Sequence, residues 1–149
     1  MKKIIFTWAI ILTAGMTSAF ANMDGGINQS TIASFKKEFV TASNVSWVTE
    51  SVYNKATFTM NDQVLFAYYS KEDNELIAVA RNLSSRQLPI HLANGLKKEC
   101  KGYWITNIFE VSKSNQTHYY ATLENSDETI VLEASDSADW TAYKKMKKS

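Results

Sequence analysis

The chain has 149 residues, of which 45% are hydrophobic and 12% aromatic, so it can build the core of one compact domain. It carries 16 basic and 15 acidic residues. This near-neutral balance excludes a protein that holds nucleic acid through a broad basic surface. The single cysteine, Cys100, excludes an intramolecular disulfide.

Residues 1–21 predict a signal peptide. Lys2 and Lys3 precede an apolar stretch from Ile4 to Leu12, and Ala19-Phe20-Ala21 places small residues where signal peptidase cleaves. The apolar stretch is shorter than the roughly 20 residues that a membrane-spanning helix needs. We therefore expect cleavage near Ala21, a periplasmic or secreted protein, and no stable membrane anchor.

The first half of the mature chain predicts one helix followed by strands. Residues 22–29 are rich in Gly and Asn and are expected to form a flexible N-terminus. Ile32, Phe35 and Phe39 then follow a helical period, with Ser30 or Thr31 as the cap. Beyond them the pattern changes to alternating strands separated by polar turns. The predicted strands are Val45–Thr49, Lys55–Met60, Val64–Tyr69 and Leu76–Arg81.

The second half repeats this order of elements. Pro89 suits the first turn of a helix whose apolar residues recur every four positions as far as Cys100, and Gly102 suits its C-terminal end. Gly95 inside this helix should cost roughly 1 kcal/mol relative to alanine. The lysines from Lys144 to Lys148 predict a solvated last strand and a frayed tail. The predicted strands are Tyr103–Ser112, Thr117–Glu124, Thr129–Ser135 and Trp140–Lys145.

Two short motifs mark this duplication. FKKEF at Phe35–Phe39 returns as LKKEC at Leu96–Cys100, and WVT at Trp47–Thr49 returns as WIT at Trp104–Thr106. We interpret the first as the same helical turn in each copy and the second as the start of the following strand. Residues 30–149 are therefore predicted to form a single α+β domain of two repeats, about 30–85 and 86–149.

The repeat also predicts which face of each strand is buried. When Ser70 is aligned with Ser135, the side chains expected to face the helices are Leu65, Ala67 and Tyr69 in the first copy and Ile130, Leu132 and Ala134 in the second. Likewise Ala56, Phe58 and Met60 align with Tyr119, Ala121 and Leu123. On the opposite face Glu133 is expected to point to solvent, and a group of exposed side chains predicts a partner-binding surface. Its candidate residues are Phe66, Tyr68, His118 and Tyr120. The alternative is that these aromatic residues are scattered or cover one another.

No catalytic residue, metal site or cofactor site is predicted. His91, His118 and Cys100 lack the spacing of metal ligands. Cys100 aligns with Phe39 and is expected to be a buried core thiol, which makes a poor nucleophile. The sequence contains neither a G-x-S-x-G motif nor a phosphate-binding glycine loop. Asp136-Ser137-Ala138 resembles a triplet that some bacteria O-glycosylate, so glycosylation of Ser137 is a hypothesis.

Three segments carry a resemblance to a known family: FKKEFVTASNVSWV, VLFAYYSKEDNELIAVARNL and LPIHLANGLKKECKGYWITNIFEV. They resemble the PepSY-like, β-lactamase-inhibitor-like family of exported proteins common in Bacteroidetes, over about Ser30 to Lys145. The resemblance implies two helix-plus-four-strand repeats in one continuous curved antiparallel sheet with the helices on one face. This chain lacks the proline usual near Val40–Thr41 and has Cys100 where the family has tyrosine. The resemblance implies no functional residues.

These observations favour an exported, non-catalytic module that binds an envelope protein or peptide through the open sheet face, with an inhibitor as a narrower form. The alternative is a periplasmic carrier of a small apolar ligand, with Tyr53, Tyr103 and His118 as polar contacts in a cavity. An enzyme is disfavoured because no catalytic group is found. The sequence does not predict the partner's identity or the oligomeric state.

Overall fold

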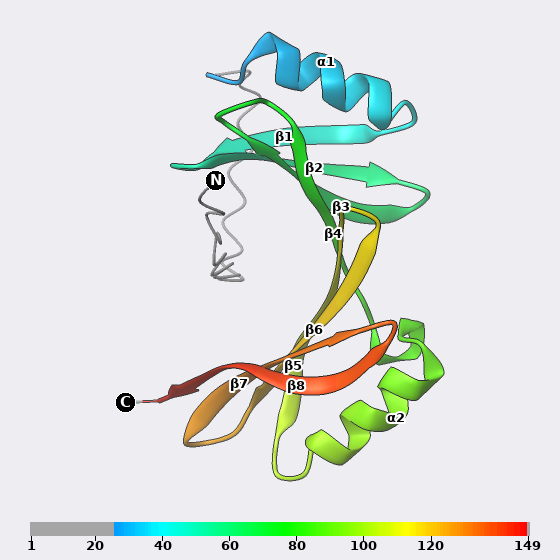
Figure 1. Ribbon diagram of the computed structural model, residues 1–149, viewed down its shortest axis with the longest axis vertical. Coiled ribbons are helices and arrows are strands. Elements are labelled where there is room, and N and C mark those ends of the chain that lie inside the picture. The colour runs from blue at the N-terminus through cyan, green and yellow to red at the C-terminus, as the bar shows by residue number, and fades with distance from the viewer. Residues whose placement is uncertain (1–25, 149) are drawn as a thin grey trace, which may run out of the picture.

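The computed structural model describes residues 26–148. Every strand pairs antiparallel with its neighbours in sequence, so the order in the single eight-stranded sheet is β1 to β8. The sheet curves into a C shape with both helices on its outer, convex face (Figure 1). The elements are α1 (Gln29–Glu38), β1 (Ser43–Thr49), β2 (Tyr53–Met60), β3 (Gln63–Ser70), β4 (Leu76–Asn82), η1 (Ser85–Gln87), α2 (Ile90–Glu99), β5 (Trp104–Lys113), β6 (Gln116–Glu124), β7 (Glu128–Ser135) and β8 (Ala138–Lys147). The predicted α+β architecture of two helix-plus-four-strand repeats is confirmed.

The start of α1 differs from the prediction. Asn28 is the N-cap, and its side chain accepts a hydrogen bond from the backbone N of Ser30 at 3.0 Å. Thr31 is buried instead, and its hydroxyl donates to Asn74 Oδ1 at 2.9 Å, which ties α1 to the β3–β4 turn. Ile27 is buried as well, so residues 26–29 are part of the fold rather than a flexible end. The predicted signal peptide and residues 22–25 lie outside the described residues.

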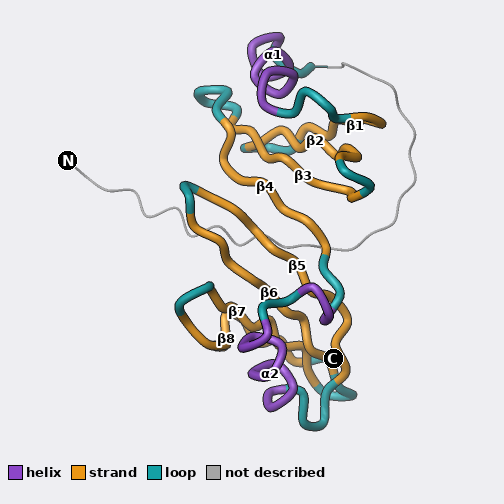
Figure 2. The backbone as a smooth tube through the Cα atoms, turned by 90° about the vertical axis from the view of Figure 1, so that its right-hand side faces the viewer, coloured by secondary structure: helices purple, strands orange, loops and turns teal. Residues whose placement is uncertain are grey.

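Each helix covers its own half of the sheet, and the two lie near opposite ends of the molecule (Figure 2). Phe35 and Phe39 of α1 pack on Phe58, with ring centroids 5.0 and 4.7 Å away. Leu92 and Leu96 of α2 are buried against β5, β6 and β7. Full burial of one such side chain stabilises the fold by roughly 1.5–3 kcal/mol. The predicted helix-facing residues of the strands lie in these two clusters. No helix among residues 26–148 is long and apolar enough to cross a membrane.

The repeated helical turn is confirmed, because α1 and α2 each have ten residues and end at Phe39 and Cys100 as C-caps. Gly102 follows with φ +81°, as a helix-ending glycine should. Cys100 is only half-buried, although it packs against the α2 cluster. Burial is nevertheless the main cause that raises the pKa of its thiol, which agrees with the prediction of an unreactive cysteine.

The repeated tryptophan is not structurally equivalent, so this part of the prediction is wrong. Trp47 is the fifth residue of β1, pairs with Ala56 and faces α1. Trp104 is the first residue of β5 and pairs with Glu124 on the opposite face. A β-bulge between Ile105 and Asn107 shifts the register of β5 and so changes which face each residue meets.

Gly95 lets β8 approach α2 closely. A Cβ atom at this position would lie 3.1 Å from Cδ1 of Trp140, which is tighter than a normal van der Waals contact. The indole Nε1 of Trp140 donates to the backbone oxygen of Leu92 at 2.8 Å. The glycine therefore makes room for the tryptophan that fastens the last strand to the helix.

The two repeats join where β4 pairs with β5, over the register Val79–Asn82 against Phe109–Ser112. On the convex face Arg81 donates twice to the carboxylate of Glu110, each time at 3.0 Å. On the concave face a buried cluster draws on both repeats: Tyr68, Ala78, Ala80, Phe109 and Val111. The repeats therefore share one cluster in addition to the ladder.

We predict that a chain ending at Ser85 does not fold cooperatively. It would keep α1 and β1–β4 but would expose Ala78 and Ala80 to water and leave Arg81 without Glu110. Circular dichroism during thermal unfolding should show a shallow transition, unlike the full chain. A sharp transition at the temperature of the full chain would show that the halves are independent.

We predict that Gly95→Ala destabilises the protein by about 1 kcal/mol, although alanine is the better helix former by a similar amount. The reason is the buried, hydrogen-bonded Trp140, which cannot move away without loss. Free energies of unfolding in denaturant would measure the change. In a Trp140→Leu background the same substitution should be neutral or stabilising. Destabilisation of equal size in both backgrounds would contradict this explanation.

Candidate functional site

The concave face of the sheet is covered by neither helix (Figure 1). Its centre, which we call the concave floor, consists of the shared cluster Tyr68, Ala78, Ala80, Phe109 and Val111. The small alanines of β4 leave room for the larger side chains of β3 and β5 beside them. All five residues are less than 10% exposed, so the floor is a packed surface.

The structure places the four predicted site residues on this face, but less exposed than expected. Tyr68 is only 8% exposed and belongs to the floor, and Phe66 and Tyr120 are half-buried beside it. The Tyr53 ring meets Tyr68 edge-on at 5.5 Å, and Phe109 stacks on Tyr120 at 5.0 Å. The aromatic residues thus cover one another, as in the alternative interpretation. Such contacts fix their positions.

A polar network stands beside this aromatic group. The carboxylate oxygen Oε1 of Glu133 accepts from the Tyr120 hydroxyl at 2.8 Å and lies 3.0 Å from His118 Nδ1. Burial and then the bond to Glu133 raise the pKa of Tyr120, so its hydroxyl remains a donor at neutral pH. Glu133 is therefore held on the concave face instead of pointing freely to solvent.

The exposed apolar residues of the concave face lie around the floor, on both arms of the C shape. We assign them to this face because each pairs or packs with a concave residue on the next strand. We call them the concave rim: Val48 (45% exposed), Val64 (52%), Trp104 (53%), Tyr143 (42%) and Met146 (38%).

Two features of the sequence hid the part of the rim that lies in the second repeat. The alternation of β5 is broken by its bulge, so Trp104 cannot be assigned a face from the pattern alone. The lysine-rich end of the chain was expected to be solvated and frayed, which hid Tyr143 and Met146. In the structure β8 extends to Lys147, and Lys148 pairs with Glu124 at 2.8 Å and lies 5.4 Å from the Trp104 ring.

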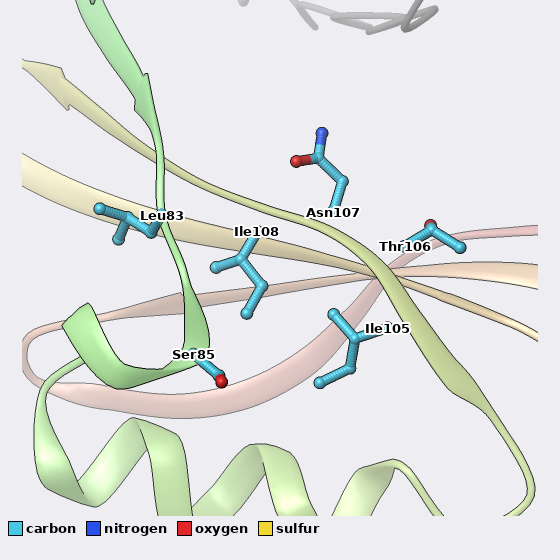
Figure 3. Close-up of a pocket in the computed structure, with 6 residues that line it drawn as sticks. All are labelled: Leu83, Ser85, Ile105, Thr106, Asn107 and Ile108. Atoms are coloured by element: carbon cyan, nitrogen blue, oxygen red, sulfur yellow. The ribbon is translucent and has the colours of Figure 1, made fainter. Parts of the chain in front are cut away.

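An open pocket of about 290 Å³ lies where β4 separates from β5. Its lining residues are Leu83, Ser85, Ile105, Thr106, Asn107 and Ile108, and the side chains of Asn107 and Ile105 point in opposite directions (Figure 3). None of the predicted carrier residues contributes. Tyr103 donates to Glu128 on the helix face, whereas Tyr53 and His118 lie in different repeats of the concave face. The predicted polar contacts of a carrier do not converge.

The described part of the chain contains no cluster of metal-ligating side chains. No three His, Cys, Asp or Glu side chains within residues 26–148 lie close enough to hold an ion. Ser137 lies in the exposed two-residue turn between β7 and β8, where its glycosylation stays a prediction.

No protein-family model matches this sequence, and no curated protein shows a significant match. Solved structures do match. A DUF2874 family protein from Bacteroides ovatus has a TM-score of 0.71 at 17% identity, covering 85% of this chain and 89% of that one. A BLIP-like protein from Bacteroides fragilis has a TM-score of 0.69 at 14% identity, covering 80% and 85%. A candidate periplasmic protein from Bacteroides eggerthii has a TM-score of 0.71 at 16% identity, covering 83% and 90%.

Identities this low establish the fold alone. The chain shares the fold of the BLIP-like protein, which confirms the β-lactamase-inhibitor-like architecture. The PepSY-like part of the resemblance stays a prediction.

We predict that Tyr68 makes the protein less stable in strong alkali. Burial, with a smaller contribution from Tyr53, raises the pKa of Tyr68 to about 12, against about 10 in an unfolded chain. This contribution to stability is full below about pH 10 and is lost as the pH rises to about 12. Unfolding free energies across this range should fall less steeply for Tyr68→Phe, by up to about 2 kcal/mol in total. Equal slopes in the two proteins would contradict the assignment.

Proposed function

We propose that the protein is an exported, non-catalytic binding module whose concave face docks against a protein or peptide of the cell envelope. The observation that carries this proposal is the uncovered concave face, with a packed aromatic floor and exposed apolar residues on both arms. A surface of this composition is typical of the centre of a protein interface.

The arrangement favours a convex partner. The rim residues Val48 and Val64 belong to the first repeat, and Trp104, Tyr143 and Met146 to the second, so a partner inserted between the arms would meet apolar side chains on both sides. A standard interface buries about 800 Å² on each partner, which requires contact with several strands. The ring contacts and the Glu133 network hold the floor in place before binding, and this lowers the entropic cost of association.

Localisation and the narrower forms of this function belong to the proposal too. The predicted signal peptide and the candidate periplasmic protein of the same fold support export to the periplasm. The BLIP-like structure supports an inhibitor as one form of binding module. The alternative function, a carrier of a small apolar ligand, has less support. The pocket at Leu83 and Ile105 is open, and its volume is at the lower limit of the range found for ligand sites.

The proposal predicts that Trp104→Ala/Tyr143→Ala binds its partner at least about tenfold more weakly, since exposed aromatic residues often dominate binding energy. The matched control is Ile90→Ala, which removes a side chain that is 77% exposed on α2, outside the concave face. The mature chain and both variants would be tagged, incubated with native envelope extract, and their retained proteins compared. A protein retained by the mature chain and the control but lost from the double variant supports the proposal. Equal retention by all three would place binding elsewhere.

A further inference from the structure

The open sheet has two edge strands, β1 and β8. An edge strand presents unpaired backbone N–H and C=O groups, and proteins commonly protect such an edge with lysines or bulges. In β8 the protection is evident, because Lys144, Lys145 and Lys147 lie in the last part of the strand.

The β1 edge is protected far less. Its sequence SNVSWVT contains no charged residue, and six of its seven residues are exposed. A bulge between Ser43 and Ser46, with Asn44 at φ +52°, distorts the first part of the strand. From Ser46 to Thr49 the ladder with β2 is regular, so this stretch can accept another strand.

The internal β4–β5 junction shows what pairing between two repeats requires. There the last strand of one repeat meets the first strand of the next. Arg81 faces Glu110 across the ladder and binds it twice, and Ala80 faces Val111. A head-to-tail assembly would have to reproduce this junction between β8 of one copy and β1 of another.

The residues of β8 and β1 disfavour such a head-to-tail contact. On β8 the position equivalent to Arg81 is Lys145. Arg81 pairs with Leu65, and Lys145 pairs with Ile130, which is the residue of the second repeat that aligns with Leu65. Lys145 is already bound to Glu128 of its own chain at 2.9 Å.

On β1 the position of Glu110 is taken by Trp47. Glu110 pairs with Tyr119, and Trp47 pairs with the repeat counterpart of that residue, Ala56. A β8–β1 contact would therefore lack the charge pair of the junction and would place a lysine against the indole edge.

The uncharged β1 edge can instead pair with itself. We propose that two copies of this chain associate through antiparallel pairing of their β1 strands about a two-fold axis at Val48, so that Trp47 of each copy lies opposite Thr49 of the other. Self-pairing brings no like charges together within the strand, and a two-fold contact closes the assembly at a dimer. The occupant of the edge is thus a second copy of the chain.

The geometry of this dimer follows from that of a sheet. A two-fold axis perpendicular to the sheet continues it from one copy to the next and leaves both concave faces on the same side. Val48, which pairs with Lys55 on the concave face and is 45% exposed, would then lie near the axis. The contact is short, so we expect a dissociation constant in about the micromolar range.

Sedimentation velocity over about a hundredfold range of concentration would test the proposal on the chain from Asn22. The variant Val48→Lys would place two like charges close to the axis and should weaken association at least about tenfold. The matched control is Val64→Lys, which adds the same charge at a side chain of similar exposure on the same face of the interior strand β3. The control should dimerise like the unmodified chain.

A chain that stays monomeric throughout the range would overturn the proposal. So would a dimer that survives Val48→Lys, or one that both substitutions weaken equally. Hydrogen exchange needs no substitution and covers the case in which Val48→Lys does not fold. The β1 amides of the unmodified chain should exchange several-fold more slowly at the high than at the low concentration, whereas unchanged exchange at β1 would also overturn the proposal.

Discussion

The pairing of β4 with β5 is the contact on which the rest of the molecule depends. Each repeat has a core between its own helix and its own strands, and those two cores do not merge. The ladder from Val79 to Asn82, the Arg81–Glu110 pair and the buried concave floor hold the repeats in one body. Leu83 adds to them, because its side chain is buried in the cluster of the second repeat and its backbone N–H donates to the Ile108 oxygen. The fixed separation of the two arms, and hence the shape of the concave face, follows from this short junction.

The same junction explains why the concave face can be apolar and still stable without a covering layer. Curvature brings side chains of neighbouring strands together on the inner face, and the alanines of β4 make space for Tyr68 and Phe109. Aromatic residues that pack on one another need less protection from water than isolated ones. The rim residues have fewer such contacts, so they retain the apolar surface that a partner can bury.

Sequence patterns predicted the fold well because each half of the chain carries its own local signals: a helical period, followed by alternating strands with polar turns. They also predicted which residues of β2, β3, β6 and β7 face the helices, because the alternation of these strands is unbroken. They failed where the pairing register shifts, as between Ile105 and Asn107 of β5. The bulge there turns Trp104 to the concave face, and the residue types give no sign of it. They also overestimated the exposure of Tyr68, since the cluster that buries it includes Phe109 and Val111 of the other repeat as well as Tyr53 and Ala78 of its own. The N-cap at Asn28 was missed because it lies two residues before Ser30 and three before Thr31, ahead of the apolar period that begins at Ile32.

The contact between Gly95 and Trp140 has a consequence for the order in which the chain acquires structure. Helix α2 contains a glycine that weakens it alone, and the side chain that compensates comes from the final strand. A chain that is synthesised from its N-terminus delivers α2 well before β8. The second repeat thus stays incompletely packed until nearly the whole polypeptide has been made.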